Sequence, residues 1–358
     1  MNTASPSRLH YCNAEQFLNF NRKVPVIDVR TPAEFEKGHI PGAFNIPMFD
    51  NDERVIVGTL YKQKSRMDAV LEGTKFVGRK LNWYIEEAVK IAKSKTLRVH
   101  CWRGGLRSEG IAWLLAAAGF EVHILTGGYK AYRHYVREQF AKPAKLIILS
   151  GMTGSGKTEI LAQLAELGEQ VVDLEHLARH KGSAFGALGQ EPQPTIETFE
   201  NVLYETWKKL DFSRPVWLED ESMFIGRVVI PQELFSQMSA SPVIKINLPT
   251  DLRIGRLLME YSGFTREELA VSFEKIIKRT GTEDYQLALK SLDEGDFGKA
   301  ARIALRFYDK AYLNQLGKRK PETIYPVDLE TDDPPASAQE IKDFVTSHNQ
   351  LFFPDSSF

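Results

Sequence analysis

The chain has 358 residues, of which 43% are hydrophobic and 26% charged, with a formal net charge of -1. This length predicts two domains, and the near-neutral charge excludes a globally basic nucleic-acid binder. We expect neither a membrane span nor a secretory leader, because no apolar run reaches about 18 residues and the first residues are polar. Two cysteines cannot build a disulfide framework, so we expect a cytoplasmic protein.

The first third of the chain alternates strand and helix patterns. A helix begins at Thr31 and Pro32, which are typical of an N-cap and a first helical position, and Gly119 ends a second helix that starts at Leu106. The predicted strands are residues 24–29, 97–101 and 121–125. Strands separated by helices indicate a parallel α/β sheet.

The same pattern restarts at about residue 144. A helix is predicted at residues 157–167, and residues 251–316 are almost wholly helical. The predicted strands are residues 145–150, 170–174, 215–219 and 243–248. We therefore predict an α/β protein with domains at 1–140 and 144–358, a short linker between them, and a helical subdomain at about 251–316.

Positive charge is concentrated in two stretches, residues 62–80 and 299–320, whereas the segment after Pro321 is acidic. Such stretches are either solvated helix faces or surfaces for a polyanion, and both interpretations stay open.

The first candidate site is a cysteine loop, CWRGGLRS, between a predicted strand and a predicted helix. Backbone N–H groups at such a helix start bind an anion and stabilise a thiolate. A buried structural cysteine is the alternative, but the adjacent glycines and arginines favour a reactive Cys101. The residues of the predicted oxyanion loop are Trp102, Arg103, Gly104, Gly105, Leu106, Arg107 and Ser108.

This first domain resembles the rhodanese family through residues 27–47, the cysteine loop and residues 125–132. The resemblance implies that Cys101 is catalytic and carries a chalcogen atom, and that Asp28 and Arg30 position the loop. The spacing from Cys101 to Arg107 is longer than in single-domain sulfurtransferases and is similar to rhodanese-like dual-specificity phosphatases. It therefore favours a phosphate-bearing or selenium-bearing donor.

The second candidate site is GMTGSGKT, which matches the P-loop pattern between a predicted strand and helix. Its N–H groups and Lys157 bind phosphate oxygens, and Thr158 is suited to hold magnesium. The predicted diphosphate-binding residues are Gly151, Thr153, Gly154, Ser155, Gly156, Lys157 and Thr158.

Three acids after a predicted strand are either metal-orienting or substrate-binding groups, or a solvated turn; they are Glu219, Asp220 and Glu221. His176 and His180 lie four residues apart, which would suit a metal on a helix, but no third ligand is evident. Hydrogen-bonded or exposed histidines are the favoured interpretation.

Together, the cysteine loop, the P-loop and the segments around residues 173–186 and 218–222 resemble the tRNA 2-selenouridine synthase family, over nearly the whole chain. The resemblance implies a rhodanese-like domain followed by a P-loop domain that replace sulfur by selenium in 2-thiouridine at the wobble position (U34) of the tRNAs for lysine, glutamate and glutamine. It implies S-geranylation with geranyl diphosphate, then selenation with selenophosphate.

The same resemblance implies an anticodon stem-loop as partner, with Trp102, Tyr129 or Tyr132 stacking on unpaired bases, and an enzyme that produces selenophosphate. Two alternatives stay open: a rhodanese-like phosphatase, and a P-loop kinase with an inactive rhodanese-like module.

Overall fold

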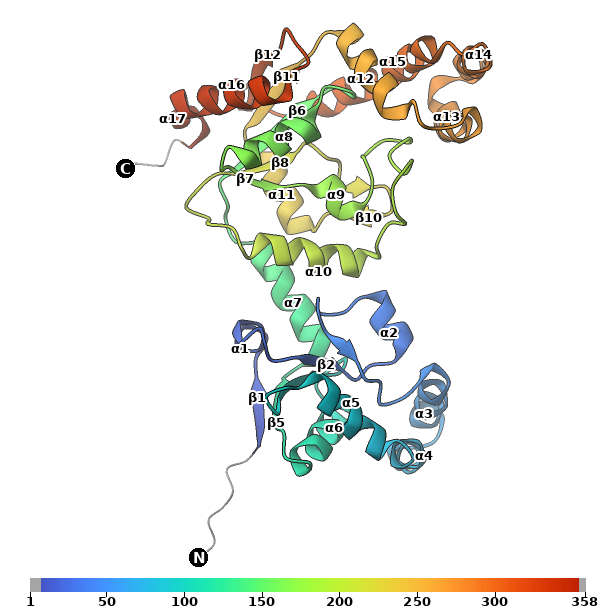
Figure 1. The fold of residues 1–358 in the computed structure, drawn as a ribbon, viewed down its shortest axis with the longest axis vertical. Helices are drawn as coiled ribbons and strands as arrows, with labels where there is room; N and C mark the ends of the chain where they lie inside the picture. Colours follow the sequence, from blue (N-terminus) through green and yellow to red (C-terminus); the bar gives the residue numbers. More distant parts are fainter. Residues whose placement is uncertain (1–7, 354–358) are drawn as a thin grey trace, which may run out of the picture. The chain divides into compact units, whose positions relative to one another are not determined.

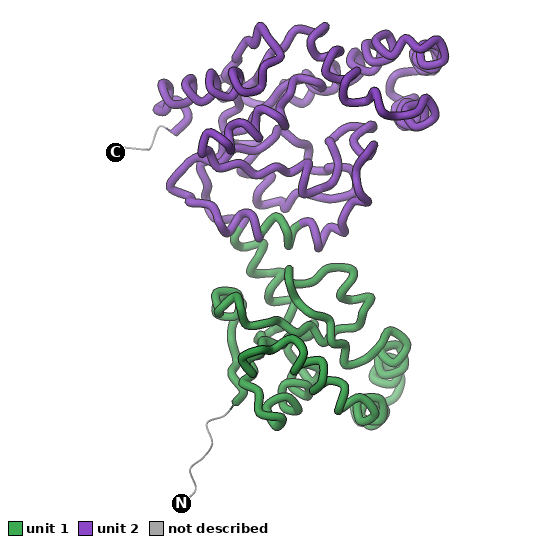
Figure 2. Tube along the Cα trace, viewed as in Figure 1, with its two compact units in different colours: residues 1–139, 200–204 green, residues 140–199, 205–358 purple. Residues whose placement is uncertain are grey.

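The computed structural model describes residues 8–353. The chain forms two compact units, one of residues 1–139 with 200–204, the other of residues 140–199 with 205–358 (Figure 2). The predicted fold class, an α/β protein with a rhodanese-like parallel sheet followed by a P-loop-like α/β domain with a helical insertion, is confirmed.

The first unit is built on a parallel five-stranded sheet in the order β1-β5-β4-β2-β3. Its central strands are buried along both side-chain rows, because helices cover both faces of a parallel sheet, and they include the buried polar residues Asp28, Arg98 and His100. The strands are β1 (Leu9–Cys12), β2 (Val26–Asp28), β3 (Phe44–Asn45), β4 (Thr96–His100) and β5 (Glu121–Leu125).

Seven helices accompany this sheet. Thr31 caps α2 through the backbone of Glu34, as predicted for that helix start. The helices α3, α4 and α5 were not among the predicted elements. The helices are α1 (Ala14–Asn19), α2 (Pro32–Lys37), α3 (Asn51–Gln63), α4 (Arg66–Gly78), α5 (Leu81–Ile91), α6 (Leu106–Ala117) and α7 (Gly128–Phe140).

The second unit has its own parallel sheet in the order β12-β11-β6-β8-β7, and a small antiparallel hairpin of β9 and β10. The strands are β6 (Leu146–Gly151), β7 (Gln170–Val172), β8 (Val216–Glu219), β9 (Phe224–Ile225), β10 (Val228–Val229), β11 (Val243–Asn247) and β12 (Ile324–Asp328). Helix α7 ends at Phe140 and β6 begins at Leu146, so five non-helical residues connect them, in keeping with the expected short linker.

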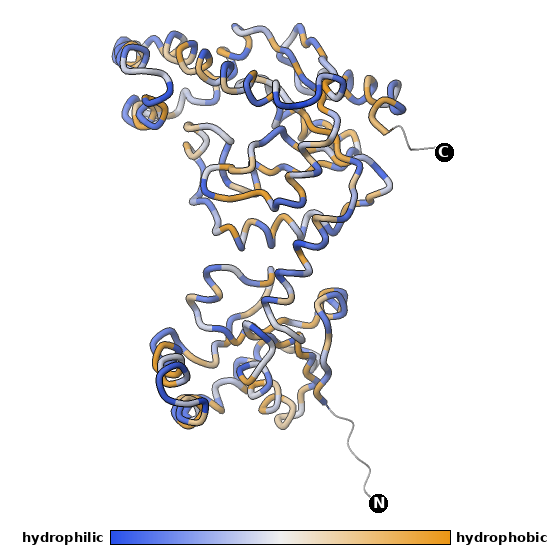
Figure 3. The backbone as a smooth tube through the Cα atoms, turned by 180° about the vertical axis from the view of Figure 1, so that it is seen from behind, coloured by the Kyte–Doolittle hydropathy of each residue, from blue (hydrophilic) through white to orange (hydrophobic). Residues whose placement is uncertain are grey.

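Four consecutive helices, α12 to α15, form the predicted helical insertion, beside the sheet and on the side away from α16 and α17 (Figure 1). Hydrophilic and hydrophobic residues are mixed along these helices (Figure 3), as expected for helices that bury one face. The helices and one 3₁₀ turn are α8 (Lys157–Glu166), α9 (Leu174–Ala178), α10 (Ile196–Trp207), α11 (Gln232–Ala240), α12 (Thr250–Tyr261), α13 (Arg266–Thr280), α14 (Thr282–Asp293), α15 (Phe297–Leu316), η1 (Pro321–Thr323), α16 (Pro334–Ser347) and α17 (Asn349–Phe352).

Each sheet presents the carboxyl ends of its strands at one edge, where ligands of open α/β sheets bind. The cysteine loop follows β4, the P-loop follows β6, and the acidic segment follows β8. No helix within residues 8–353 is both long enough and apolar enough to cross a membrane.

Candidate functional site

The cysteine loop is held between β4 and α6 by the backbone of α7. The carbonyls of Cys101 and Trp102 accept hydrogen bonds from the N–H groups of Tyr129 (2.8 Å) and Lys130 (3.0 Å). Gly128 has a φ of +60°, and a Cβ there would lie 2.4 Å from the Cys101 carbonyl oxygen. Only glycine can adopt this conformation without a clash. Gly128 therefore allows the start of α7 to pack directly against the backbone of the cysteine loop.

The backbone N–H groups of the loop are not engaged in carbonyl hydrogen bonds. From Trp102 to Leu106, all within the described chain, no N–H group donates to a carbonyl. The loop leads directly into the N-terminus of the 12-residue helix α6. Successive N–H groups that bond to no carbonyl at a helix start can form an anion site, and that of Arg103 already donates to the Cys101 thiol.

The Cys101 thiol lies at the bottom of this loop and is only 3% exposed. Its Sγ atom is 3.2 Å from the hydroxyl oxygen of Ser108. Burial alone would raise the pKa of Cys101, but hydrogen bonds from the Ser108 hydroxyl and from the N–H groups of Arg103 and Ser108, with the charge of Arg107, bring it below the usual value. The site therefore favours a thiolate, the nucleophilic form of cysteine.

Removal of the Ser108 hydroxyl tests this arrangement. A hydrogen bond to a charged group contributes about 1.5–3 kcal/mol, so Ser108→Ala raises the pKa of Cys101 and slows its alkylation by iodoacetamide at neutral pH about tenfold. The rate is measured against pH in a Cys12→Ser background, where Cys101 is the one remaining cysteine. A pH profile that stays in place or moves to lower pH would contradict the assignment.

Two ion pairs frame the cysteine loop. Arg107 binds both carboxylate oxygens of Glu34, at 2.6 and 3.2 Å, and this charge keeps the pKa of Glu34 low although burial opposes it. Arg30 pairs with Asp28 at 2.6 Å, and both side chains are fully buried. The Arg30–Asp28 pair has the positioning geometry that was predicted. Arg107 is oriented by Glu34, while Arg103 is exposed.

The prediction that Tyr129 or Tyr132 stacks on RNA bases is wrong. Both rings are 0% exposed, because β5 leads into α7 and turns this face of the helix into the core. Tyr129 instead lies under the Arg30 guanidinium, 3.9 Å from its carbon, and accepts a hydrogen bond from Asn201 at 2.8 Å. Trp102 is partly exposed, so stacking of its ring on an RNA base stays a prediction.

The P-loop has the geometry of a phosphate cradle. Gly154 and Gly156 take φ values of +78° and +80° between β6 and α8, which turns the loop back on itself. The Lys157 ammonium donates to the Gly151 carbonyl at 3.0 Å and thus bends over the loop. The loop opens into a cleft of about 560 Å³, which we call the phosphate cleft. Its lining includes four cationic side chains, those of Lys157, Lys181, Arg256 and Arg279.

The three acids after β8 separate into different environments. Asp220 lines the cleft but pairs with Arg319 at 2.6 Å and accepts a hydrogen bond from Ser150 at 2.6 Å. Glu219 is fully buried and accepts from the N–H of Leu174 at 3.0 Å. Glu221 lines the cleft together with Glu175.

These carboxyl groups lie close together near the P-loop. Burial raises the pKa of Glu219 and Glu221 well above the usual value, and repulsion from nearby carboxylates adds to both shifts. Burial also raises the pKa of Glu175, against the opposing charge of Lys157. A cation in the cleft would relieve this repulsion.

The residues present fit a magnesium ion. Magnesium is usually bound by one or two carboxylates together with substrate phosphates. The Thr158 hydroxyl and the Glu175 carboxylate lie 3.3 Å apart beside the P-loop and provide that donor set. Among the described residues no group of three or more His, Cys, Asp or Glu side chains is arranged to hold a metal, so phosphate oxygens would complete the site.

His176 and His180 do not share a helix face. Helix α9 ends at Ala178, and Arg179 takes a left-handed φ of 52° before His180. The prediction that favoured ordinary histidines over a metal site fits this geometry.

The basic stretches carry many charges that are already paired. Salt bridges join Arg302 to Asp251 at 3.0 Å and Arg306 to Asp284 at 2.9 Å. In the other stretch, Lys80 pairs with Glu53 at 2.5 Å. This pairing favours solvated helix faces for these particular residues.

The insertion also supplies residues that the motifs do not indicate. Tyr261 of α12 and Tyr308 of α15 line the phosphate cleft. They lie far from the P-loop in sequence, and only their aromatic character in amphipathic helices could have drawn attention to them.

Comparison with known proteins matches both units. The family model described as the tRNA 2-selenouridine synthase AAA domain matches residues 144–331, and that of the rhodanese-like domain matches residues 13–135. A crystal structure of an N-terminal domain from Clostridium difficile 630 is 39% identical and has a TM-score of 0.34; the match covers 35% of this chain and 98% of that one.

Similar full-length proteins carry the same description, tRNA 2-selenouridine synthase. The protein from Sulfurovum sp. strain NBC37-1 is 35% identical over 81% of this chain and 80% of its own length. The proteins from Shewanella sediminis and Marinobacter nauticus are each 34% identical, over 84% and 87% of this chain and 90% and 94% of their own lengths. With its thiolate loop, its P-loop and these relatives, the chain belongs to the tRNA 2-selenouridine synthase family.

Proposed function

We propose that this enzyme replaces sulfur by selenium in 2-thiouridine at the wobble position (U34) of the tRNAs for lysine, glutamate and glutamine. It first S-geranylates the thiouridine with geranyl diphosphate and then exchanges the geranylthio group for selenium from selenophosphate. The observation that supports this most strongly is the presence of two anion sites in one chain, a thiolate loop and a P-loop. A two-step exchange with two phosphorylated donors needs both.

In the first step, the thiouridine sulfur attacks C1 of geranyl diphosphate. The S–C1 bond forms, the C1–O bond breaks, and its electron pair leaves with diphosphate, while the N3 proton of the uracil passes to solvent. The P-loop N–H groups and Lys157 stabilise the charge that develops on the diphosphate. Magnesium, bound through Thr158 and Glu175, would supply further charge neutralisation.

The second step is redox neutral if the Cys101 thiolate attacks phosphorus. The S–P bond forms, the P–Se bond breaks, and selenide leaves with the electron pair. Selenide then adds to C2 of the uracil and expels geranylthiolate, and water hydrolyses the phosphocysteine. A selenopersulfide formed from selenophosphate would require a two-electron oxidant, whereas the loop N–H groups and the low pKa of Cys101 support attack at phosphorus.

The proposed reaction requires two partners, a source of selenophosphate and an RNA substrate. Selenophosphate must come from an enzyme that produces it, which we propose as a functional partner. The anticodon stem-loop is the proposed RNA partner, since its unstacked bases are accessible to an enzyme.

The test uses the purified full-length protein and an anticodon stem-loop with 2-thiouridine. Geranyl diphosphate and then selenophosphate are added, and the nucleosides are weighed by mass spectrometry. We expect an S-geranylated nucleoside that converts to 2-selenouridine. An unchanged nucleoside from folded protein would overturn the proposal. Rapid hydrolysis of an aryl phosphate would then favour a phosphatase, and nucleotide turnover independent of Cys101 a kinase.

A further inference from the structure

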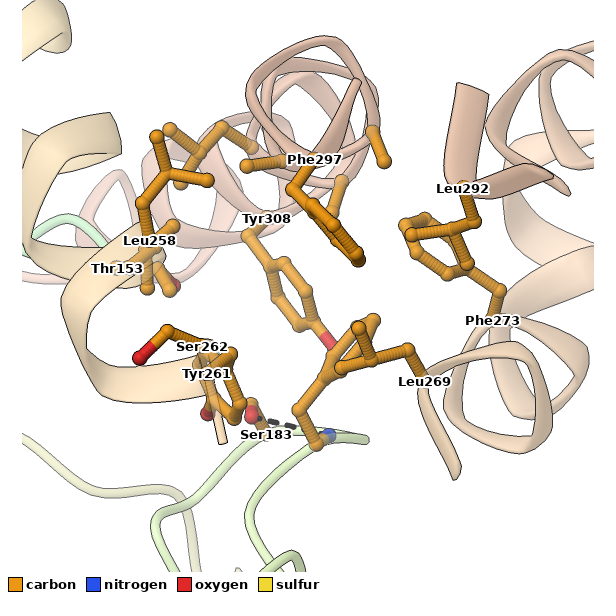
Figure 4. Close-up of a pocket in the computed structure, with 16 residues that line it drawn as sticks. Thr153, Ser183, Leu258, Tyr261, Ser262, Leu269, Phe273, Leu292, Phe297 and Tyr308 are labelled. Atoms are coloured by element: carbon orange, nitrogen blue, oxygen red, sulfur yellow. Dashed lines mark hydrogen bonds between the residues drawn. The ribbon is translucent and has the colours of Figure 1, made fainter. Parts of the chain in front are cut away.

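The helical insertion contains a cavity that none of the sequence motifs explains (Figure 4). Its volume is about 280 Å³, and its lining is mostly aliphatic and aromatic. Leu269 and Phe273 of α13, Leu292 of α14 and Ala304 of α15 contribute to it. A cavity with such a lining is suited to an apolar ligand.

This apolar cavity adjoins the phosphate cleft. Five residues line both: Thr153, Ser183, Leu257, Tyr261 and Tyr308. Thr153 belongs to the P-loop itself, so the polar and apolar sites meet where the phosphates bind. One molecule with a phosphorylated head and an apolar tail can therefore occupy both.

The volume sets the length of such a tail. A cavity of about 150 Å³ holds benzene, which corresponds to ~25 Å³ per carbon. On that scale the 280 Å³ cavity accommodates about eleven carbons. A ten-carbon chain fits, whereas a fifteen-carbon chain requires about 375 Å³.

We propose that this cavity binds the prenyl tail of the diphosphate donor and restricts it to ten carbons, with Phe273 and Leu292 as the end wall. The inference rests on the proposed geranylation. Figure 4 shows Phe273 and Leu292 on the side of the cavity away from Thr153. Each is 4% exposed, and Phe273 packs edge-on against Phe185 with centroids 5.1 Å apart, so the wall is fixed by the core of the insertion.

Small residues of α15 line one side of the cavity. Ala300 and Ala304 are buried on α15 at 2% and 7% exposure, and both line the cavity. Their lack of larger side chains leaves the space that the chain would fill. A leucine at position 304 would add three carbons, which on the same scale removes room for about three carbons of ligand.

The experiment measures transfer of C5, C10 and C15 prenyl groups from their diphosphates to a 2-thiouridine stem-loop. Wild type should prefer geranyl over farnesyl by at least about 10²-fold, since even one misfitting methylene in an apolar pocket costs about 10–200-fold. Phe273→Ala removes six ring carbons and should raise the farnesyl-to-geranyl ratio by about 10²-fold. Ala304→Leu should do the opposite and shift use from geranyl to dimethylallyl diphosphate.

Val271→Ala is the matched control, because Val271 lies on the same helix but is exposed and does not line the cavity. If Phe273→Ala and Ala304→Leu transfer geranyl with the wild-type length preference, the cavity assignment is overturned while geranylation stands. If wild type transfers no prenyl group, the proposed function and this inference both fail. Should Phe273→Ala not fold, Ala304→Leu alone decides.

Discussion

We expect replacement of Cys101 by serine to abolish selenation and to leave S-geranylation at the wild-type rate. Loss of a covalent nucleophile lowers the rate by about 10³–10⁶-fold, because a serine hydroxyl is hardly ionised at neutral pH. The thiolate at this position is stabilised by the Ser108 hydroxyl and by the N–H groups of Arg103 and Ser108, which all belong to the first unit. The measurement follows both nucleosides over time with the Cys101→Ser protein.

Geranylation is the internal control for folding of this variant. Equal loss of both activities would contradict the separation of the two steps.

The nature of the covalent step is tested with thiophosphate, a stable analogue of selenophosphate. We expect wild-type protein, quenched in acid, to carry a phosphoryl group on Cys101, and an adduct of one sulfur atom would instead support a persulfide.

Replacement of Lys157 by alanine has the complementary effect. We expect geranylation to fall by about 10²–10³-fold, the usual loss when a group that stabilises transition-state charge is removed. Selenation of a stem-loop that is already S-geranylated should be unaffected, since Cys101 and its loop lie in the first unit. Each half-reaction is therefore measured separately, with its own substrate.

Lys290→Ala is the matched control for Lys157→Ala. Its side chain is 70% exposed and pairs only weakly, at 3.7 Å, with Glu294 one helical turn away. The control removes the same charge without touching the phosphate cleft. Normal geranylation by the Lys157→Ala protein would contradict a role of the P-loop in the first step.

Local sequence signals indicated the cysteine loop and the P-loop as candidate anion sites, and they predicted many of the strands of both sheets. The strand β6, the P-loop and α8 follow one another within a few residues, so their boundaries were predicted to within one residue. The helical stretch predicted at 251–316 corresponds to α12 to α15, and within it a threonine cap and a glycine stop mark the ends of α13.

The helices α3 and α4 escaped prediction for a physical reason. None of the residues of α3 is buried, and α4 buries only Ala69 and Gly73. Helices with so little buried surface lack the apolar periodicity on which a sequence-based prediction depends.

Long-range packing explains the remaining differences. Tyr129 and Tyr132 looked like exposed stacking residues because no local pattern shows which face of α7 meets the sheet. The apolar cavity is assembled from the P-loop, the loop after α9 and all four helices of the insertion. Its chemistry becomes visible only when these distant segments are brought together.

The segment Glu200–Tyr204 belongs to the first unit, although the chain reaches it only after the P-loop. Glu200 pairs with Arg133, and Asn201 donates to the carbonyl of His39 at 2.8 Å and to the hydroxyl of Tyr129 at 2.8 Å. A fragment that stops at residue 140 would lose these bonds, and a buried polar group without its partner is costly. A chimera that joins the first unit of one relative to the second unit of another at residue 140 would therefore lack part of the first unit. Residues 200–204 would have to come from the same relative as residues 1–139.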